Sequence, residues 1–306
     1  MSSASQIAAI VKKDVIAELR TKEMVVSMFL FVMLIMVAFH YGFGESSDFA
    51  PFAGGLIWIA FLFTSLLGLN RSFVHEKEEG CLEGLLLSPV DRPNIFFGKM
   101  IGNLIFLSIV ELIAIPLYLV MLNLTIKGSI PMFILAIVLS NIGICTVGTL
   151  LSTISVNTKM RDMLLPLIYL PLSSPLLIAA VISTNGVMQG YSGDDFQQVL
   201  SAMKILAGYD IIFLLVAYAL YDFVIGNEFM KKATTILLGI GSALLLTGIA
   251  FAFLVAPIAI DPDSGKELFH QKILYFHVPV AETSLVSFIL GAIFGALFLY
   301  KKERKY

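Results

Sequence analysis

The chain has 306 residues, of which 58% are hydrophobic and only 14% are charged. A mean hydropathy of +0.92 leaves too few polar residues to cover a soluble globular protein of this length, so the composition predicts an integral membrane protein. The formal net charge of -2, with basic residues dispersed along the chain, implies no nucleic-acid partner.

Ile7 to Glu23 combines apolar and charged positions with a helical period, which predicts an interfacial helix over residues 7–23 rather than a membrane span. Apolar segments of about 20 residues follow, the length that crosses about 30 Å of hydrocarbon. We therefore expect an all-α polytopic membrane protein with eight spans: Met24–Phe43, Phe52–Asn70, Ile95–Leu122, Pro131–Thr153, Leu164–Ser183, Tyr209–Ile225, Thr234–Pro257 and His277–Tyr300.

The basic residues predict the orientation of these spans. All lysines and arginines except Lys127, Lys204, Lys266 and Lys272 fall on alternate connections and at the two ends of the chain. Basic residues near short loops resist translocation. We therefore expect both termini, and the connection after the second span, to be cytoplasmic.

That second connection, residues 73–89, is the one substantial polar stretch in the first half of the chain. Its charges come first, and Leu82, Leu85, Leu86 and a closing Pro89 follow. The pattern predicts a short amphipathic helix that ends before the proline and lies against the membrane or under a partner. An ordinary solvated connector is the alternative.

Glu111 lies near the middle of the third span, where an ionised carboxylate is costly, so it should face the bundle interior, be protonated or contact a polar path. In the same span, Gly98 and Gly102 have the spacing that permits close helix approach; Gly291 and Gly295 repeat it near the end of the chain.

The fifth span contains Pro166, Pro171 and Pro175. Membrane helices tolerate proline where neighbours satisfy the freed backbone groups, so these prolines are interpreted as packing features, with a gating hinge as the alternative. The following segment, Val187 to Ala207, predicts an outward loop and a short surface helix, or a re-entrant element.

The sequence predicts no enzyme active site and no metal site. Its four histidines are scattered over both faces, and Cys81 and Cys145 fall at different membrane levels. Gly98-Lys99 and Gly265-Lys266 lack the Ser or Thr and the upstream glycine of a phosphate-binding loop. The chain is therefore not expected to hydrolyse nucleotides itself.

The polar stretch resembles the CcmB family, the membrane permease of the cytochrome c maturation ABC transporter. The residues that carry the likeness are Phe73 to Gly80, Leu82 to Pro89, Lys99, and Leu164 to Leu172 with Pro175. The resemblance covers residues 1–226 and implies a six-span bundle of the ABC-2 permease type in the bacterial inner membrane.

The resemblance also implies partners and coupling residues. The partners are a separately encoded CcmA-like ATPase, CcmC-like and CcmD-like membrane subunits, a periplasmic CcmE-like haem chaperone, and a second copy of the chain. The residues expected to couple to the ATPase are Glu76, Glu79, Gly80, Leu82, Glu83, Leu85, Leu86 and Pro89.

Residues 227–306 change character, and residues 272–281 resemble the beginning of CcmC, a haem-handling membrane protein. In that family the motif's histidine, here His277, is an axial haem ligand. The family's tryptophan-rich platform and second histidine are missing, since Trp58 is the only tryptophan. We therefore expect no tightly bound cofactor: the chain alone should bind haem weakly or not at all, and tight binding should need a partner that carries the tryptophan-rich loop.

Two other classes of function remain open. A proton-coupled secondary transporter would use Glu111 and Asp222 as a relay, although such carriers usually show internal repeats. A non-transporting scaffold would bind haem-handling enzymes. Co-purification of an ATPase separates the permease from both.

Overall fold

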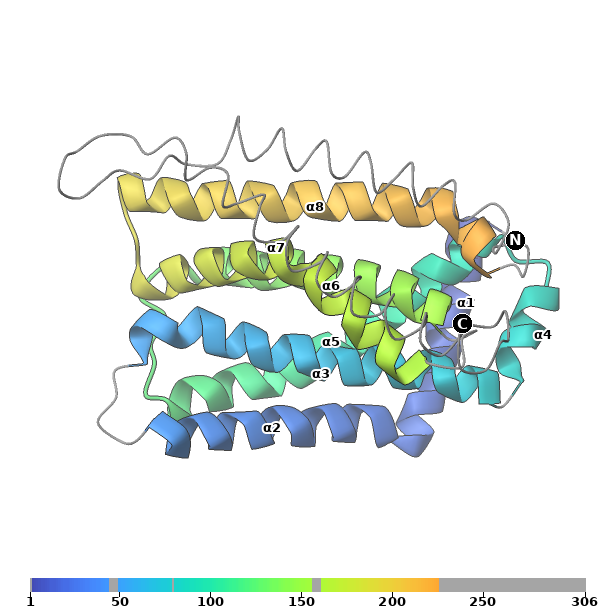
Figure 1. Cartoon of the computed structure of the whole chain (residues 1–306), viewed down its shortest axis with the longest axis horizontal. Coiled ribbons are helices and arrows are strands. Elements are labelled where there is room, and N and C mark those ends of the chain that lie inside the picture. Colours follow the sequence, from blue (N-terminus) through green and yellow to red (C-terminus); the bar gives the residue numbers. More distant parts are fainter. Residues whose placement is uncertain (1, 44–48, 79, 156–160, 226–306) are drawn as a thin grey trace, which may run out of the picture. The chain divides into compact units, whose positions relative to one another are not determined.

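The computed structural model of the chain describes residues 2–43, 49–78, 80–155 and 161–225 (Figure 1). The chain divides into two units, Met1–Asn227 and Glu228–Tyr306. The second unit lies outside the described residues. The expected spans Thr234–Pro257 and His277–Tyr300 lie there, and they stay predictions.

The described part of the chain is helical and contains no strand. Six of its helices are long and apolar enough to cross a membrane, which confirms the predicted all-α polytopic class. They are α2 (Glu23–Phe43), α3 (Ala53–Glu78), α5 (Arg92–Met121), α6 (Ile130–Ser155), α7 (Arg161–Gln189) and α8 (Asp194–Ile225); α1 (Ser3–Thr21), the 3-10 helix η1 (Ala50–Phe52) and α4 (Cys81–Leu87) are the others.

The helix α2 shows how one face of a span is selected for burial. Met24, Met28, Val32 and Met36 recur every fourth residue and are at most 6% exposed, so they form one stripe along the helix. The stripe packs on α3, where a Cβ added at Gly68 would lie 2.6 Å from the Met28 sulfur. The residues on the opposite side, including Leu30 and Leu34, are exposed and suit lipid contact.

The predicted interfacial helix is present as α1, which begins at Ser3 and lies across the ends of the membrane-crossing helices (Figure 1). Lys22 ends it in the left-handed conformation, with φ 58°, and the chain turns into α2. The Glu18 carboxylate accepts a hydrogen bond of 2.8 Å from the Val25 N–H, which satisfies a donor in the first turn of α2. We call this end of the bundle, which also carries α4, the α1 end, and the opposite end the far end.

The helix α1 packs closely on the start of α5. A Cβ added at Gly98 would lie 2.7 Å from Ile10 Cγ2, and one at Gly102 would lie 3.5 Å from an Asp14 carboxylate oxygen. The Asn94 amide donates to the Gln6 side chain at 2.6 Å. The Gly98/Gly102 pair therefore does permit close helix approach, and its neighbour is α1.

The helix α7 runs without a break through Pro166, Pro171 and Pro175. Pro175 has no N–H to donate to the Pro171 carbonyl four residues earlier, and the Ser174 hydroxyl donates to that carbonyl instead, at 2.8 Å. The Tyr209 hydroxyl of α8 donates to the Leu172 carbonyl at 3.0 Å. The Ser174 side chain thus replaces one lost backbone bond, and Tyr209 adds a contact from α8, which favours the packing interpretation of these prolines.

The segment after α7 differs from its prediction. The helix α7 continues to Gln189, the turn is confined to residues 190–193, and α8 begins at Asp194 and runs to Ile225. The predicted short surface helix and the alternative re-entrant element over Val187 to Ala207 are therefore wrong, and the predicted loop is limited to the turn at residues 190–193. The apolar residues of that segment face the bundle, since Val199, Ala202 and Leu206 are at most 3% exposed. The segment is therefore the first part of a membrane-crossing helix.

Candidate functional site

The polar stretch over residues 73–89 is divided between two helices. Residues up to Glu78 continue α3 beyond its apolar span, which ends at Ser72. Gly80, in the left-handed conformation with φ 69°, precedes the short helix α4. The prediction that the charges open the amphipathic helix is therefore wrong. The apolar part does form a helix before Pro89, and the Ser88 hydroxyl closes it by donating to the Leu85 carbonyl at 2.6 Å.

The predicted coupling residues fall on both sides of Gly80. Leu85 is half-buried and Pro89 is exposed. Leu82, Glu83 and Leu86 lie on α4, but their side chains, like the whole of Glu79, are outside the described residues. The sequence prediction did not single out Leu87, which is 88% exposed at the end of α4.

Glu76 is the coupling candidate with the most contacts in the described structure. Its carboxylate lies 2.6 Å from the Lys99 ammonium of α5 and also binds the Lys13 ammonium of α1. Asp14 lies 3.0 Å from each of these lysines. Two carboxylates and two ammonium groups from three helices therefore form one charge-balanced cluster, the Glu76 cluster.

The Glu76 cluster is shielded from water except at Lys13, whose side chain is 44% exposed. The Lys99 side chain is 1% exposed, while those of Glu76 and Asp14 are 9% and 11% exposed. Burial raises the pKa of the Glu76 carboxyl, but the charges of Lys99 and Lys13 outweigh it and hold the pKa below the ordinary value of 4.5. Burial likewise lowers the pKa of the Lys13 ammonium, but Glu76 and Asp14 outweigh it and hold the pKa above 10.5.

Glu111 lies inside the bundle, as one of the sequence interpretations expected, and is 2% exposed. The Asn141 amide of α6 donates to its carboxylate at 2.5 Å. Asp210 on α8 is also buried, and neither of its carboxylate oxygens has a hydrogen-bond partner among the described residues. Sequence reasoning did not identify Asp210, and it proposed Asp222, whose side chain is outside the described residues.

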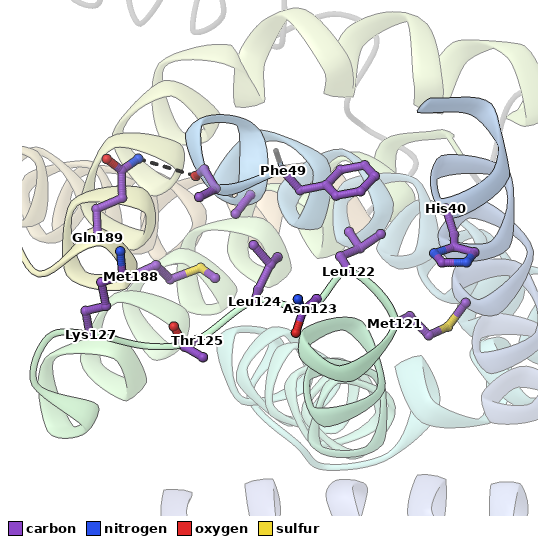
Figure 2. Close-up of a pocket in the computed structure, with 12 residues that line it drawn as sticks. His40, Phe49, Met121, Leu122, Asn123, Leu124, Thr125, Lys127, Met188 and Gln189 are labelled. Atoms are coloured by element: carbon purple, nitrogen blue, oxygen red, sulfur yellow. Dashed lines mark hydrogen bonds between the residues drawn. The ribbon is translucent and has the colours of Figure 1, made fainter. Parts of the chain in front are cut away.

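The far end of the bundle contains a cavity of about 440 Å³, the far-end pocket. The ends of α2, α5 and α7, the start of α3 with η1, and the segment after α5 line it (Figure 2). Its polar lining residues are His40, Asn123, Thr125, Lys127 and Gln189. None of them was singled out as a site residue from the sequence, because each is a lone polar residue near the end of a span.

The far-end pocket has fixed walls. The Gln189 amide donates to the Ala50 carbonyl at 3.3 Å (Figure 2), and the Tyr118 hydroxyl donates to the Ala53 carbonyl at 2.7 Å. The Lys127 N–H donates to the Met188 carbonyl at 2.9 Å. These bonds join α3, α5 and α7 around the cavity.

Residues 5–222 match the family model described as CcmB protein. This chain belongs to the CcmB family. The match includes all six membrane-crossing helices almost to the end of α8, together with the Glu76 cluster and the far-end pocket. The CcmC-like resemblance lies beyond the matched residues, and the haem-ligand candidate His277 is outside the described residues, so both stay predictions.

Curated relatives agree with the CcmB assignment. The chain is 27% identical over 179 residues to heme exporter protein B of Pseudomonas aeruginosa, covering 58% of this chain and 80% of the relative. It is 28% identical to heme exporter protein B of Rhodobacter capsulatus, covering 48% and 68%. The protein of the same name from Haemophilus influenzae is 23% identical, covering 64% and 89%.

Proposed function

We propose that this protein is the membrane permease subunit of an ABC transporter of cytochrome c maturation, and that it takes part in haem delivery or in release of the periplasmic haem chaperone. Membership of the CcmB family and the names of its relatives support this function. The partners we propose are a CcmA-like ATPase, CcmC-like and CcmD-like membrane subunits, a CcmE-like chaperone and a second copy of the chain. His277 is the proposed haem ligand toward the CcmC-like partner.

The observation that carries the coupling proposal is the position of Glu76. It lies on the extension of α3, a few residues before α4 begins at Cys81. Its carboxylate is bound to α1 through Lys13 and to α5 through Lys99. A displacement of α4 by a bound ATPase therefore has a short, charged route into α1 and α5. The exposed side chain of Leu87 extends the apolar contact proposed for Leu85 and Leu86.

Co-purification with the ATPase tests the proposal. Replacing Leu85 and Leu86 with Asp should abolish ATPase binding while membrane insertion persists, since each apolar side chain removed from such a contact costs about 1.5–3 kcal/mol. The matched control is Leu19→Asp, which places the same charge on an exposed leucine of α1 at the same end of the bundle. Retention of the ATPase by the double variant at the wild-type level contradicts the coupling role of α4.

The secondary-transporter alternative rests on the buried carboxylate of Glu111. The bond from Asn141 gives this side chain a packing role between α5 and α6. Glu111→Gln keeps a side chain that can bond to Asn141 but cannot carry a proton, so under our proposal cytochrome c maturation in cells should persist. Loss of maturation in a folded Glu111→Gln protein that still binds the ATPase favours the proton relay.

A further inference from the structure

We propose that the far-end pocket is a haem-docking site, with the His40 imidazole as the axial ligand of the iron and the Lys127 ammonium as the partner of a propionate. This inference rests on the proposed function, because that function makes haem the molecule handled. It names residues other than His277, and it places haem on the six-span part of the chain itself.

His40 provides the first observation. Its Nδ1 atom is buried and makes no hydrogen bond with the described residues. Histidine binds haem iron through Nε2, the ring nitrogen remote from Cβ, so Nε2 is the proposed ligand atom; the unpaired Nδ1 shows that no hydrogen bond from the described residues holds the ring through that nitrogen. A neutral imidazole is the commonest protein ligand for metals and a usual axial ligand of haem iron.

The body of the pocket suits a flat apolar molecule. Phe49, Leu122 and Leu124 contribute apolar surface, and Met121 and Met188 contribute thioethers. The volume of about 440 Å³ falls in the range of about 300–1,000 Å³ typical of small-molecule sites. Thioether sulfur also serves as an axial haem ligand, so a methionine in the lining is compatible with an iron at His40.

The charge of the pocket suits an anion. Figure 2 shows His40 at one side of the pocket, and Lys127 with Gln189 at the other. The described lining residues include no carboxylate, and the Lys127 ammonium forms no ion pair within the part of the chain that the structure describes. Haem has the same asymmetry, with a central metal and propionates on one edge only.

The pocket walls and the ligand set together indicate reversible binding. The backbone bond between Lys127 and Met188 and the Gln189 bond to Ala50 fix the lysine side of the cavity before any ligand arrives, which reduces the ordering cost of binding. A single histidine and one exposed lysine make a weak site. Weak binding agrees with the expectation that the isolated chain holds no haem tightly, and it suits a molecule in transit between partners.

The test is a titration of the purified full-length protein in detergent with ferric haem, followed by the Soret absorbance. Wild type should show a shifted, saturable Soret band. His40→Ala should lose the shift, because the iron loses its imidazole. Lys127→Gln should keep the shifted band but bind about two- to fivefold more weakly, the effect of losing one exposed ion pair.

Two controls make the outcomes distinct. His75→Ala, on the α3 extension at the other end of the bundle, and His277→Ala should leave the isolated chain's spectrum unchanged. A shifted band that survives His40→Ala, or the absence of any saturable band in wild type, overturns the site. Protoporphyrin without iron should bind without any dependence on His40; a His40 dependence would point to packing rather than ligation.

The same preparations are assayed for co-purified ATPase, which reports on the proposed function independently. ATPase retained without haem binding at His40 overturns only the docking site. ATPase absent despite His40-dependent binding overturns only the permease assignment.

Discussion

At the scale of single residues, Glu76, which the sequence predicted to couple to the ATPase, forms ion pairs with the buried Lys99 and the half-exposed Lys13. Glu76 belongs to a run of charges that looks solvated in the sequence, and its partner Lys13 lies 63 positions away. No local pattern shows such a pairing. Removing one partner of a buried pair leaves an uncompensated charge, which costs far more stability than losing an exposed pair does. Substitutions at Lys99 and at Glu76 therefore test the cluster in two different ways.

Replacing Lys99 with Met should destabilise the protein by about 3 kcal/mol, the lower end of the range for a broken buried pair, because Lys13 remains beside both carboxylates. The measurement is unfolding of the purified protein in detergent. Arg71→Met is the control: its pair with Glu23 spans 3.6 Å, with side chains 52% and 73% exposed, and should contribute no more than about 1 kcal/mol. The same substitution also removes exposed hydrogen bonds from Arg71 to the Glu23 carbonyl and the Ser27 hydroxyl. Equal effects of the two substitutions would contradict the buried cluster.

The lowered pKa of Glu76 predicts a dependence of stability on pH. A carboxyl whose pKa is lower in the folded state contributes stability above its ordinary value of 4.5, and the contribution is lost as the pH falls through the lower, folded value. The melting-temperature difference between wild type and Glu76→Gln should therefore be constant near neutral pH and shrink below about pH 4.5. A difference that grows on acidification would show that the sign of the shift is wrong.

At the scale of elements, the sequence predicted which segments are helical better than where each helix turns. The apolar runs identify the membrane helices, because burial in hydrocarbon requires long uninterrupted apolar segments. The extension of α3 to Glu78 and the early start of α8 at Asp194 were missed for one reason. Each is a polar or amphipathic segment that continues a span, and composition cannot distinguish a continued helix from a loop.

The contact between α1 and α5 gives a prediction about an element. Gly98→Ala should destabilise the protein by about 1–3 kcal/mol, the cost of overpacking, because the new Cβ meets the Ile10 side chain. Gly208→Ala in α8 is the control, since a Cβ there meets nothing within 4 Å and alanine favours the helix by about 0.5–1 kcal/mol. Thermal unfolding of both variants measures the difference. Ile10→Ala should cost less stability in the Gly98→Ala background than in the wild type, and an equal cost in both would show that α1 does not pack there.

At the scale of the whole molecule, the described helices bring to one end the segments that the basic residues predicted to share a side of the membrane, while the side itself stays a prediction. The six spans alternate so that α1, α4 and the end of α8 lie at the α1 end, where most of the described basic residues lie. The far-end pocket could not be predicted in this way. His40 and Lys127 are far apart in the sequence and belong to no motif, and only the ends of α2, α5 and α7 bring them to one cavity.

Thiol labelling of intact cells tests the orientation. Cys81 is exposed on α4 and Cys145 is buried, so the wild-type protein should not react with an impermeant maleimide added from outside, but should react at Cys81 once the membrane is opened. Ser192→Cys, in the turn between α7 and α8, should react in intact cells, and so should Ser46→Cys. Labelling of Cys81 or of Ser88→Cys from outside would reverse every assignment of sides.

The two ends of the bundle are held by different forces. At the far end, backbone hydrogen bonds join Lys127 to Met188 and Gly128 to Val187; at the α1 end, α1, α3 and α5 are held by the charged side chains of the Glu76 cluster. Lys13 is 44% exposed and so gives a partner's charges access to the cluster, whereas backbone bonds offer such charges little to compete for. An ATPase acting at the α1 end would therefore tilt the helices about their far ends. The displacement should be largest beside the ATPase and smallest around the pocket, so that haem docked there would meet nearly the same walls throughout the ATPase cycle.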